Sequence, residues 1–403
     1  ELPSEEIPVF LRSTGCVGHP LTRAVRRGSP SPLRLGYPVI FLEGEMEIIK
    51  QNVVIHLEDC LNVLRSMREN SVDAVVTDPP YGLSFMGKKW DYDVPSVALW
   101  TECLRVLKPG GHLLAFAGTR TQHRMACRIE DAGFDIRDML AWVYGSGWPK
   151  SKNLDGDYKG FGSALKPALE PITLARKPMT GTLAENVNLW GTGALNIDGC
   201  RISGEAWAKN TSSTAPIGKP VVTVSDHQWG LKEIEKHSNL LCRRPANLIH
   251  DGSAEVLSLF PACAALTGKK TFGMGNRGDG NSKLNCYGDI YRKDNWIGFK
   301  DEAGSAARFF YSAKANKRDR GEGNNHPTVK PTDLMRYLCR LVTQPGGVIL
   351  DPFMGSGSTG KAAIRERFGF VGVERDNDSY ATARERLLRE TAQGLLDLDN
   401  NRI

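Results

Sequence analysis

Residues 346–360 read GGVILDPFMGSGSTG, an apolar strand that runs into a glycine-rich loop. Residues 361–367, KAAIRER, then have the composition of a helix. Glycines allow the backbone N–H groups of such a loop, and the helix N-terminus behind it, to approach a bound molecule closely. The segment therefore predicts a strand–loop–helix unit of an α/β fold with a cofactor against the loop.

The loop alone leaves the kind of cofactor open. Gly355, Gly357 and Gly360 satisfy the G-x-G-x-x-G pattern of dinucleotide-binding folds. The loop also comes within one residue of a P-loop, but Ala362 stands where Ser or Thr would hold Mg²⁺, which argues against ATP. Glu374 ends the next apolar run, where a carboxylate can hydrogen-bond ribose hydroxyls. NAD and S-adenosylmethionine both carry such a ribose, so these residues do not choose between them.

A second motif lies nearer the other end of the chain, where the apolar run 73–77 leads into Asp78-Pro79-Pro80-Tyr81. Both prolines fix φ and hold the preceding residue extended, so the carbonyls there point in set directions. One carboxylate, one rigid carbonyl and one flat ring suit an exocyclic amine on a heterocycle, because they offer two acceptors and a stacking surface. The purely structural alternative is a turn whose Asp caps the next segment.

The two motifs in this order resemble the β-class of S-adenosylmethionine-dependent DNA amino-methyltransferases. That family carries a catalytic D-P-P-Y half, a target-recognition region and then a D-P-F-x-G-x-G cofactor loop, and the chain shows the same order. The resemblance extends from about Ile48 to about Leu388. Further matching stretches are 57–61 (LEDCL), 105–116 (RVLKPGGHLLAF) and 326–331 (HPTVKP).

The resemblance implies an α/β, Rossmann-like methyltransferase fold with a mostly parallel sheet, circularly permuted so that the catalytic half precedes the cofactor half. The alternation of strand and helix patterns also favours a parallel α/β sheet. We expect strands at 53–57, 72–77, 112–117, 136–143, 170–176, 308–314 and 370–374, and helices at 60–67, 97–107, 121–132 and 361–367. In the sheet that the resemblance implies, the strands before Asp78 and Asp351 are neighbours and flank the point where strand order reverses, so both motifs are expected to share one pocket.

The expected division of the chain follows the same family order. Residues 1–45, rich in Pro and Gly, match nothing in the family and are expected to be a disordered extension or a cloning artefact, with Met46 starting the folded unit. Between about Met179 and about Gly304 the regular alternation stops, and Gly, Asn, Ser and Trp accumulate. The expected parts are 1–45, the catalytic half 46–178, an inserted target-recognition region 179–307, the cofactor half 308–395 and a C-terminal tail 396–403.

The resemblance also assigns roles at the site. Asp78 and the Pro79 carbonyl would each accept one N–H of the target amine, and Tyr81 beside Pro80 would stack on the flipped base. The expected cofactor contacts are Asp59 (adenine), Glu374 (ribose), the loop residues Asp351, Phe353, Gly355, Gly357, Ser358 and Thr359, and, at the methionine end, His326, Thr328 and Lys330. No metal is expected.

Contacts to double-stranded DNA are less specific. Residues 151–330 hold 25 Lys and Arg against 18 Asp and Glu, within a chain whose net charge is +6. Such an excess suits a phosphate backbone or an ordinary solvated surface. The candidate contacts are Trp90, Arg243, Arg244, Lys269, Lys270, Arg277 and Lys283; for each the alternative is a surface residue or, for Trp90, packing.

The target atom depends on one residue. In the family, Asp at the first motif position goes mainly with adenine N6, and Ser or Thr mainly with cytosine N4. Asp78 therefore favours adenine N6, although cytosine N4 presents the same two hydrogens. A NAD-dependent oxidoreductase would leave 78–81 without a role, and a non-catalytic DNA-binding regulator would be expected to have lost part of the motifs. Related N-P-P-Y enzymes that act on proteins or RNA usually carry the cofactor loop first.

Composition sets the remaining expectations. The 403 residues, 40% hydrophobic, can form one large catalytic domain plus an insert. No apolar run reaches the roughly 18 residues of a membrane span, and residues 1–45 lack a signal peptide. The nine cysteines show no C-x-x-C spacing, which argues against zinc and for a reduced compartment. We expect a cytoplasmic, bacterial or phage-encoded enzyme, from a restriction–modification system or acting alone, with homodimerisation a family tendency.

Overall fold

The computed structural model describes residues 45–50, 52–84, 91–147, 149, 151–202, 243–263, 266–267, 300–301, 304–313, 317–321, 324, 326 and 328–400. By its internal contacts the chain divides into Glu1–Val39 and Ile40–Ile403, and every described residue lies in the second unit. Several predictions fall outside the described residues: the extension 1–44, Trp90, Lys269, Lys270, Arg277, Lys283 and the last three residues of the tail.

One large sheet organises the described residues. Its strands are β1 (Glu45–Lys50), β2 (Val53–Leu57), β3 (Val72–Thr77), β4 (Leu107–Phe116), β5 (Asp135–Val143), β6 (Leu169–Arg176), β7 (Leu248–His250), β12 (Tyr311–Ser312), β13 (Val348–Asp351) and β14 (Gly369–Glu374). The helices are α1 (Cys60–Ser66), α2 (Val97–Val106), α3 (Gln122–Asp131), α4 (Leu183–Trp190), α5 (Ala254–Leu257), α6 (Lys317–Arg320), α7 (Thr332–Val342), α8 (Ser358–Arg365) and α9 (Asn377–Asn400). Shorter elements are η3 (Gly156–Tyr158), η4 (Asp198–Cys200), β8 (Ala262–Cys263), β9 (Leu266–Thr267), β10 (Lys300–Asp301), β11 (Gly304–Ser305) and η7 (Ala306–Phe309).

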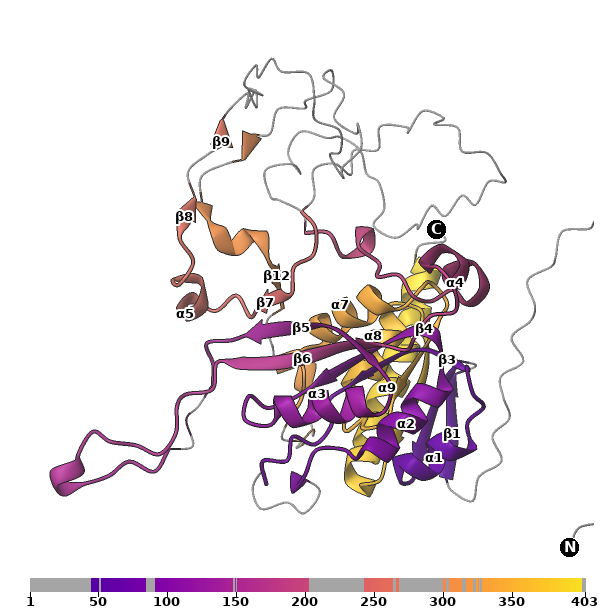
Figure 1. Ribbon diagram of the computed structural model, residues 1–403, viewed down its shortest axis with the longest axis horizontal. Coiled ribbons are helices and arrows are strands. Elements are labelled where there is room, and N and C mark those ends of the chain that lie inside the picture. Colours follow the sequence, from indigo (N-terminus) through magenta and orange to yellow (C-terminus); the bar gives the residue numbers. More distant parts are fainter. Residues whose placement is uncertain are drawn as a thin grey trace, which may run out of the picture. The chain divides into compact units, whose positions relative to one another are not determined.

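The strand order across the sheet is β1-β2-β14-β13-β3-β4-β6-β5-β7-β12 (Figure 1). Among the described strands of this sheet, β1 and β6 run antiparallel to their neighbours and the other pairs are parallel. The predicted α/β fold with a mostly parallel sheet is therefore confirmed. The expected pairing of the strands before Asp78 and Asp351 is also confirmed, since β13 lies beside β3 in parallel.

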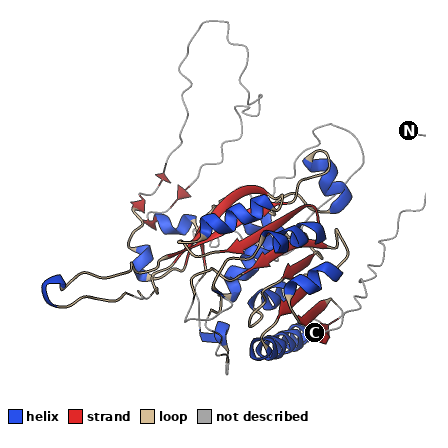
Figure 2. Ribbon diagram, turned by 60° about the horizontal axis from the view of Figure 1, so that its bottom comes forward, coloured by secondary structure: helices blue, strands red, loops and turns tan. Residues whose placement is uncertain are grey.

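Helices cover both faces of the sheet (Figures 1 and 2). On one face α1, α2 and α3 bury a core that includes Leu64, Trp100 and Ile129. On the other face α7, α8 and α9 bury a core that includes Leu338 and Leu387. Because both faces are covered, β3 reads as a continuous buried run rather than an alternating one. This layering leaves the carboxyl ends of the central strands as the open edge of the domain.

Helix α8 begins at Ser358, three residues before the predicted start at residue 361. Gly357 caps it with φ +81°, a left-handed conformation that favours glycine. Gly360 sits in the first turn, and a Cβ there would lie 2.7 Å from Leu387 Cδ2 and 2.8 Å from Phe370 Cε1. Glycine at this position therefore lets α8 pack closely against α9 and β14.

The predicted strand at 308–314 is wrong in its extent. The 3-10 helix η7 takes its first part, with the Ser305 hydroxyl accepting the Ala307 N–H at 3.2 Å. Only Tyr311 and Ser312 form a strand, β12, which pairs with β7 at the edge of the sheet. Side-chain capping has here replaced part of a strand pattern with a helical turn.

The sequence pattern also missed α4 in the irregular region. Thr182 and Glu185 form a capping box, in which the Thr182 hydroxyl accepts the Glu185 N–H and Glu185 accepts the Thr182 N–H. Buried Asn186 on this helix donates to the carbonyl of Pro109 in β4 at 2.9 Å. Since α4 packs on β4 and β7 joins the main sheet, the boundaries of a recognition region at 179–307 stay a prediction. None of the helices in the described ranges has the length and apolar character to cross a membrane.

Candidate active site

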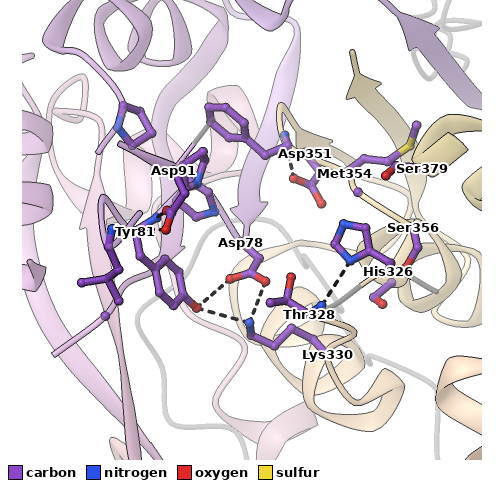
Figure 3. A pocket seen from close by; sticks show the side chains of 18 of the residues that line it. Asp78, Tyr81, Asp91, His326, Thr328, Lys330, Asp351, Met354, Ser356 and Ser379 are labelled. Atoms are coloured by element: carbon purple, nitrogen blue, oxygen red, sulfur yellow. Dashed lines mark hydrogen bonds and ion pairs between the residues drawn. The ribbon is translucent and has the colours of Figure 1, made fainter. Parts of the chain in front are cut away.

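The two sequence motifs meet at the carboxyl edge of the sheet. Asp78 follows β3, Asp351 ends β13, and the chain leaves these neighbouring strands towards opposite sides of the sheet, to β4 and β14. Open α/β sheets bind ligands at such a reversal of strand order. A cleft of about 1780 Å³ lies here, lined by both motifs. Figure 3 shows Asp78 at its centre, with Asp351 and Met354 from the glycine-rich segment nearby.

Both oxygens of the Asp78 carboxylate are held. Oδ1 lies 2.7 Å from the Tyr81 hydroxyl, and Oδ2 lies 2.6 Å from Lys330 Nζ (Figure 3). Each carboxylate oxygen has two lone pairs, so each retains room for one more donor. Asp78 is therefore fixed as a hydrogen-bond acceptor whose remaining lone pairs are available at the cleft.

A second carboxylate, Glu170 of β6, completes this cluster. Glu170 Oε2 lies 3.3 Å from Lys330 Nζ and 3.2 Å from the Tyr81 hydroxyl. Burial would lower the pKa of Lys330, but the adjacent Asp78 and Glu170 carboxylates raise that pKa above its ordinary value. Burial, and then the same carboxylates, raise the pKa of Tyr81 well above its ordinary value. The cluster thus contains a charged ammonium and a neutral phenol.

The loop after the two prolines is fixed by Asp91, which is 2% exposed. Its carboxylate accepts the backbone N–H groups of Tyr81 at 2.6 Å, Gly82 at 2.9 Å and Leu83 at 3.2 Å. The Thr121 hydroxyl donates to the Tyr81 carbonyl at 2.6 Å. Tyr81 is therefore held at both its backbone and its side chain, and the ring is presented in one position.

The glycine-rich loop is tied to Glu374 at the end of β14. Glu374 Oε2 accepts the Gly355 N–H at 2.9 Å, while Oε1 accepts the N–H groups of Arg375 and Asp376, both at 2.9 Å. Burial raises the pKa of the Glu374 carboxyl above its ordinary value. A Cβ on Gly355, whose φ is +52°, would lie 3.1 Å from His326 Nε2. Glycine keeps this approach to the cleft open.

Asp351 is almost completely buried under the loop, with 2% exposure. Its Oδ1 accepts the Phe353 N–H at 3.1 Å, which fixes the turn after β13. Burial raises the pKa of Asp351 to about 7. Phe353, Ser358 and Thr359 line the cleft beside it, and their contact with a cofactor stays a prediction. The carboxyl group of Asp351 supports the loop from beneath.

Residues of the HPTVKP stretch lie between Asp78 and the loop (Figure 3). His326 Nδ1 accepts the Thr328 N–H at 3.4 Å, and burial lowers the His326 pKa, so the imidazole is neutral at neutral pH. Thr328 lines the same cleft. Lys330, predicted with these two residues at the cofactor, lines the cleft and makes polar contacts with the Asp78, Tyr81 and Glu170 side chains; its contact with a cofactor stays a prediction.

At the far side of the cleft, Asp59 follows β2 and caps α1 by accepting the Leu61 N–H at 2.9 Å. It lines the cleft together with Glu374. The residues present fit a nucleoside that carries a positively charged sulfur. Glycine at position 355 leaves space that a Cβ would fill, and three carboxylates, of Asp59, Asp78 and Glu374, lie near strand ends and suit a positive charge.

Two predicted DNA contacts are described, and neither lines this cleft. Arg243 is exposed, exchanges backbone hydrogen bonds of 3.0 Å with Ile202, and places its guanidinium carbon 3.6 Å from the centroid of the Phe309 ring. Arg244 is exposed. Their part in DNA binding stays a prediction.

Glu170 and Asp91 are site residues that sequence reasoning missed. The sequence pattern predicts Glu170 at the start of the strand 170–176 and assigns it no chemical role, although an acid next to Pro171 in an otherwise apolar strand is a usable signal. Asp91 is one of several acids in a loop, and its three contacts are made by folding alone. Within the described residues, no group of three or more His, Cys, Asp or Glu side chains could hold a metal ion.

A family model described as DNA methylase matches residues 72–385, a stretch that begins with β3 and ends within α9. The chain is similar to the type II methyltransferase M.HindIII of Haemophilus influenzae, with 21% identity over 392 residues covering 83% of this chain and 94% of that protein. Among solved structures, it is similar to the cytosine-N4-specific PvuII DNA methyltransferase, with 14% identity, a TM-score of 0.43 and coverage of 85% and 93% of the two chains. The M1.HpyAVI–SAM complex gives 17% identity, a TM-score of 0.38 and coverage of 83% and 98%.

Proposed function

The chain belongs to the DNA methylase family, and from that premise we propose that it transfers a methyl group from S-adenosylmethionine to the exocyclic N6 of an adenine flipped out of double-stranded DNA. The observation that carries this proposal is the placement of Asp78 opposite the glycine-rich loop in one cleft. A carboxylate acceptor and a nucleoside-binding loop at one strand reversal are the two parts that direct methyl transfer to an amine requires.

The target amine is held by acceptors on the Asp78-Pro79 dipeptide. The N6 lone pair is delocalised into the adenine ring, which makes the nitrogen a poor nucleophile. Asp78 and the Pro79 carbonyl each accept one N–H, which draws the nitrogen towards tetrahedral geometry and frees its lone pair. Because Tyr81 and Lys330 already fix the carboxylate, the gain comes from positioning and electrostatics. No covalent enzyme intermediate is required.

The part of the cleft lined by Asp59, Glu374 and the glycine-rich loop would hold the methyl donor. When bound, S-adenosylmethionine supplies a methyl group on a cationic sulfur, which keeps the C–S electron pair as the amine nitrogen forms the new N–C bond. Glu374 would bind the ribose hydroxyls, Asp59 would contact the adenine, and the 353–359 segment would enclose the donor. Asp78 then accepts the proton that the methylated nitrogen releases and passes it to water.

The cleft is large enough for both molecules. Its volume of about 1780 Å³ exceeds the about 300–1,000 Å³ of a site for one small molecule. Flipping a base out of the duplex costs a few kcal/mol, and stacking on the fixed Tyr81 ring offsets part of that cost. Sequence recognition is assigned to residues 179–307, and we keep homodimerisation as a prediction.

Adenine N6 is proposed over cytosine N4 because Asp stands at the first motif position. Cytosine N4 is the second candidate, since its amine offers the same two hydrogens to Asp78 and Pro79. Nucleoside mass spectrometry of unmethylated plasmid DNA incubated with the protein and S-adenosylmethionine distinguishes adenine N6 from cytosine N4 as the methylated atom. We expect N6-methyladenine. N4-methylcytosine would keep the mechanism and overturn the base assignment, and the absence of both, with donor binding confirmed, would refute DNA methylation.

A further inference from the structure

Lys330 occupies an unusual place for a lysine. It is 6% exposed, and its Nζ lies 2.6 Å from Asp78 Oδ2 and 3.3 Å from Glu170 Oε2. The same nitrogen lies 3.2 Å from the Tyr81 hydroxyl. A buried ammonium is costly unless it is paired and hydrogen-bonded. Every one of these partners belongs to the group that would hold the target amine.

The ammonium lies deeper than the carboxylate it holds. The side chain of Lys330 is 8% exposed, whereas that of Asp78 is 18% exposed. Nζ also lies 4.9 Å from the centroid of the Phe116 ring, and Phe116 is fully buried at the end of β4. The Lys330 ammonium therefore binds the Asp78 carboxylate from the side of the core, which leaves the side of the carboxylate that faces the cleft open.

We propose that Lys330, charge-balanced by Glu170, is a positioning residue for methyl transfer, which keeps Asp78 an ionised and oriented acceptor of the target amine. This inference rests on the proposed function. It assigns Lys330 a role at the target amine, in place of the predicted contact with the cofactor. Because Lys330 and Tyr81 hold one oxygen each, the carboxylate cannot rotate, and its free lone pairs stay directed at the amine.

The charges of the cluster suit this role. Two carboxylates and one ammonium, with Tyr81 neutral, leave one net negative charge, which matches the single positive charge of a sulfonium donor. Without the ammonium, Asp78 and Glu170 would face each other as like charges, and such pairs come to share a proton. A protonated Asp78 would present an O–H donor in place of one acceptor and, being neutral, would accept the N–H of the amine more weakly.

Other titratable groups face the cluster and must be considered in any pH experiment. They are Tyr81, Tyr144 beside Glu170, His326 and Asp351. Burial lowers the pKa of His326, so its imidazole stays neutral to lower pH than an ordinary histidine. Asp351 titrates at about 7 in its buried position and is present in every variant compared below, so only changes relative to the wild type are read.

The test compares Lys330→Met with Lys108→Met. Lys108 pairs with Asp73 at the opposite end of β3, also at 2.6 Å, and does not line the cleft. For Lys330→Met we expect the single-turnover methylation rate to fall roughly 100-fold, as when one oriented electrostatic group is lost. We also expect the acidic limb of its pH–rate profile to move to higher pH. Lys108→Met should retain the wild-type methylation rate, and the acidic limb of its pH–rate profile should stay at the wild-type position.

Two further measurements distinguish positioning from donor binding. Calorimetric titration should give a Kd of Lys330→Met for S-adenosylmethionine within about threefold of the wild type, less than 1 kcal/mol by the usual conversion. In Lys330→Met/Glu170→Gln the like-charge pair is gone, so the acidic limb should return towards its wild-type position. A Kd weakened more than about tenfold with an unmoved limb would make Lys330 a cofactor ligand and overturn the proposal.

The inference can fail independently of the proposed function. If the wild type methylates no DNA, the proposed function fails, and urea unfolding of both variants between pH 5 and pH 8 still tests the cluster. A shared proton raises the folded pKa of the carboxylate pair, so Lys330→Met should lose stability relative to the wild type as pH rises. In Lys108→Met the unpaired carboxylate of Asp73 has no second carboxylate beside it in the pair, so any change of its unfolding free energy with pH should be smaller than that of Lys330→Met. Parallel curves for Lys330→Met and the wild type would refute the inference.

Discussion

Asp78 receives its position from side chains far away in the sequence. The Lys330 ammonium, from the segment before α7, and the Tyr81 hydroxyl each bind one oxygen of the Asp78 carboxylate. Glu170 of β6 contacts the same ammonium and the same hydroxyl. Hydrogen bonds to a charged group are the stronger class, at about 1.5–3 kcal/mol each, so the carboxylate is held firmly. The acceptor geometry is therefore a property of the cluster rather than of the Asp-Pro-Pro-Tyr motif alone.

Substitution of Asp78 by Asn tests the acceptor role at this scale. The amide keeps the size of the side chain but replaces one acceptor oxygen with a donor, which opposes the N–H of the amine. We expect the single-turnover rate of methylation to fall about 10²–10³-fold, as for loss of one preorganised electrostatic contact. Rapid-quench assays measure the rate, and donor titration serves as the control. A rate near that of the wild type would remove Asp78 from the mechanism.

At the scale of elements, the site depends on two loops and on one close helix contact. The loop after β3 is shaped by the buried carboxylate of Asp91, and the loop after β13 by Glu374 and by Asp351. Helix α8 meets β14 and α9 across Gly360. In each case a loop position is set by hydrogen bonds or packing that the neighbouring elements supply.

Substitution of Asp91 by Ala should loosen the loop that carries Tyr81. Three backbone N–H groups lose their acceptor, and leaving a buried group unsatisfied costs about 1–3 kcal/mol. We expect a loss of unfolding free energy in that range by urea titration, together with weaker binding of target DNA. The matched control is Asp93→Ala in the same loop, whose side chain is 62% exposed and pairs with Arg128. Equal losses in both variants would contradict the role of Asp91.

Substitution of Gly360 by Ala should strain the packing of α8. The new methyl group would meet Leu387 Cδ2 at 2.7 Å and the Phe370 ring at 2.8 Å, and overpacking of this kind costs about 1–3 kcal/mol. Thermal unfolding should show a lower Tm. Gly304→Ala is the control, because its methyl group would meet only the flexible guanidinium of Arg308, at 2.9 Å. An unchanged Tm for Gly360→Ala would show that α8 can shift without cost.

For the described part of the molecule as a whole, buried titratable groups set opposing dependences on pH. Burial raises the pKa of Asp351 to about 7 and lowers the pKa values of His56 and His112 to about 4 each. The histidines contribute stability above pH 6.5 that is lost as pH falls towards 4. The stability of the folded chain should therefore decline on acidification and also, because of Asp351, on alkalinisation.

Substitution of Asp351 by Asn isolates the alkaline part of this dependence. The folded pKa of Asp351 is raised above its unfolded value near 4, so its stabilising protonated form is lost as pH rises through about 7. Asn has no charge to bury, so the unfolding free energy of the variant should rise relative to that of the wild type between pH 5 and pH 9, by on the order of 2–3 kcal/mol. Urea unfolding across that range measures the difference. A difference independent of pH would show that Asp351 is ionised throughout.

The sequence by itself determined the parallel α/β class, most of the strands and helices around 53–176 and 348–374, and the adjacency of the two motifs. The class and the elements follow from local patterns, since apolar runs, glycines and prolines restrict the backbone wherever they occur. The adjacency of the two motifs follows from the resemblance to the methyltransferase family. The sequence also pointed to the residues at the strand ends, since the carboxyl ends of parallel strands meet at one edge. It missed the capping box at Thr182 and extended the strand at 308–314 too far.

Only the tertiary structure decided which side chains surround Asp78. Lys330 was assigned to the cofactor, Glu170 had no assigned role, and Asp91 was one acid among several, because no local pattern encodes a contact between residues so distant in the chain. Their places follow from burial: an ammonium and two carboxylates removed from water must pair with one another, and the fold brings these together at the end of β3. Electrostatic pairing in the folded interior, rather than sequence pattern, builds the acceptor site.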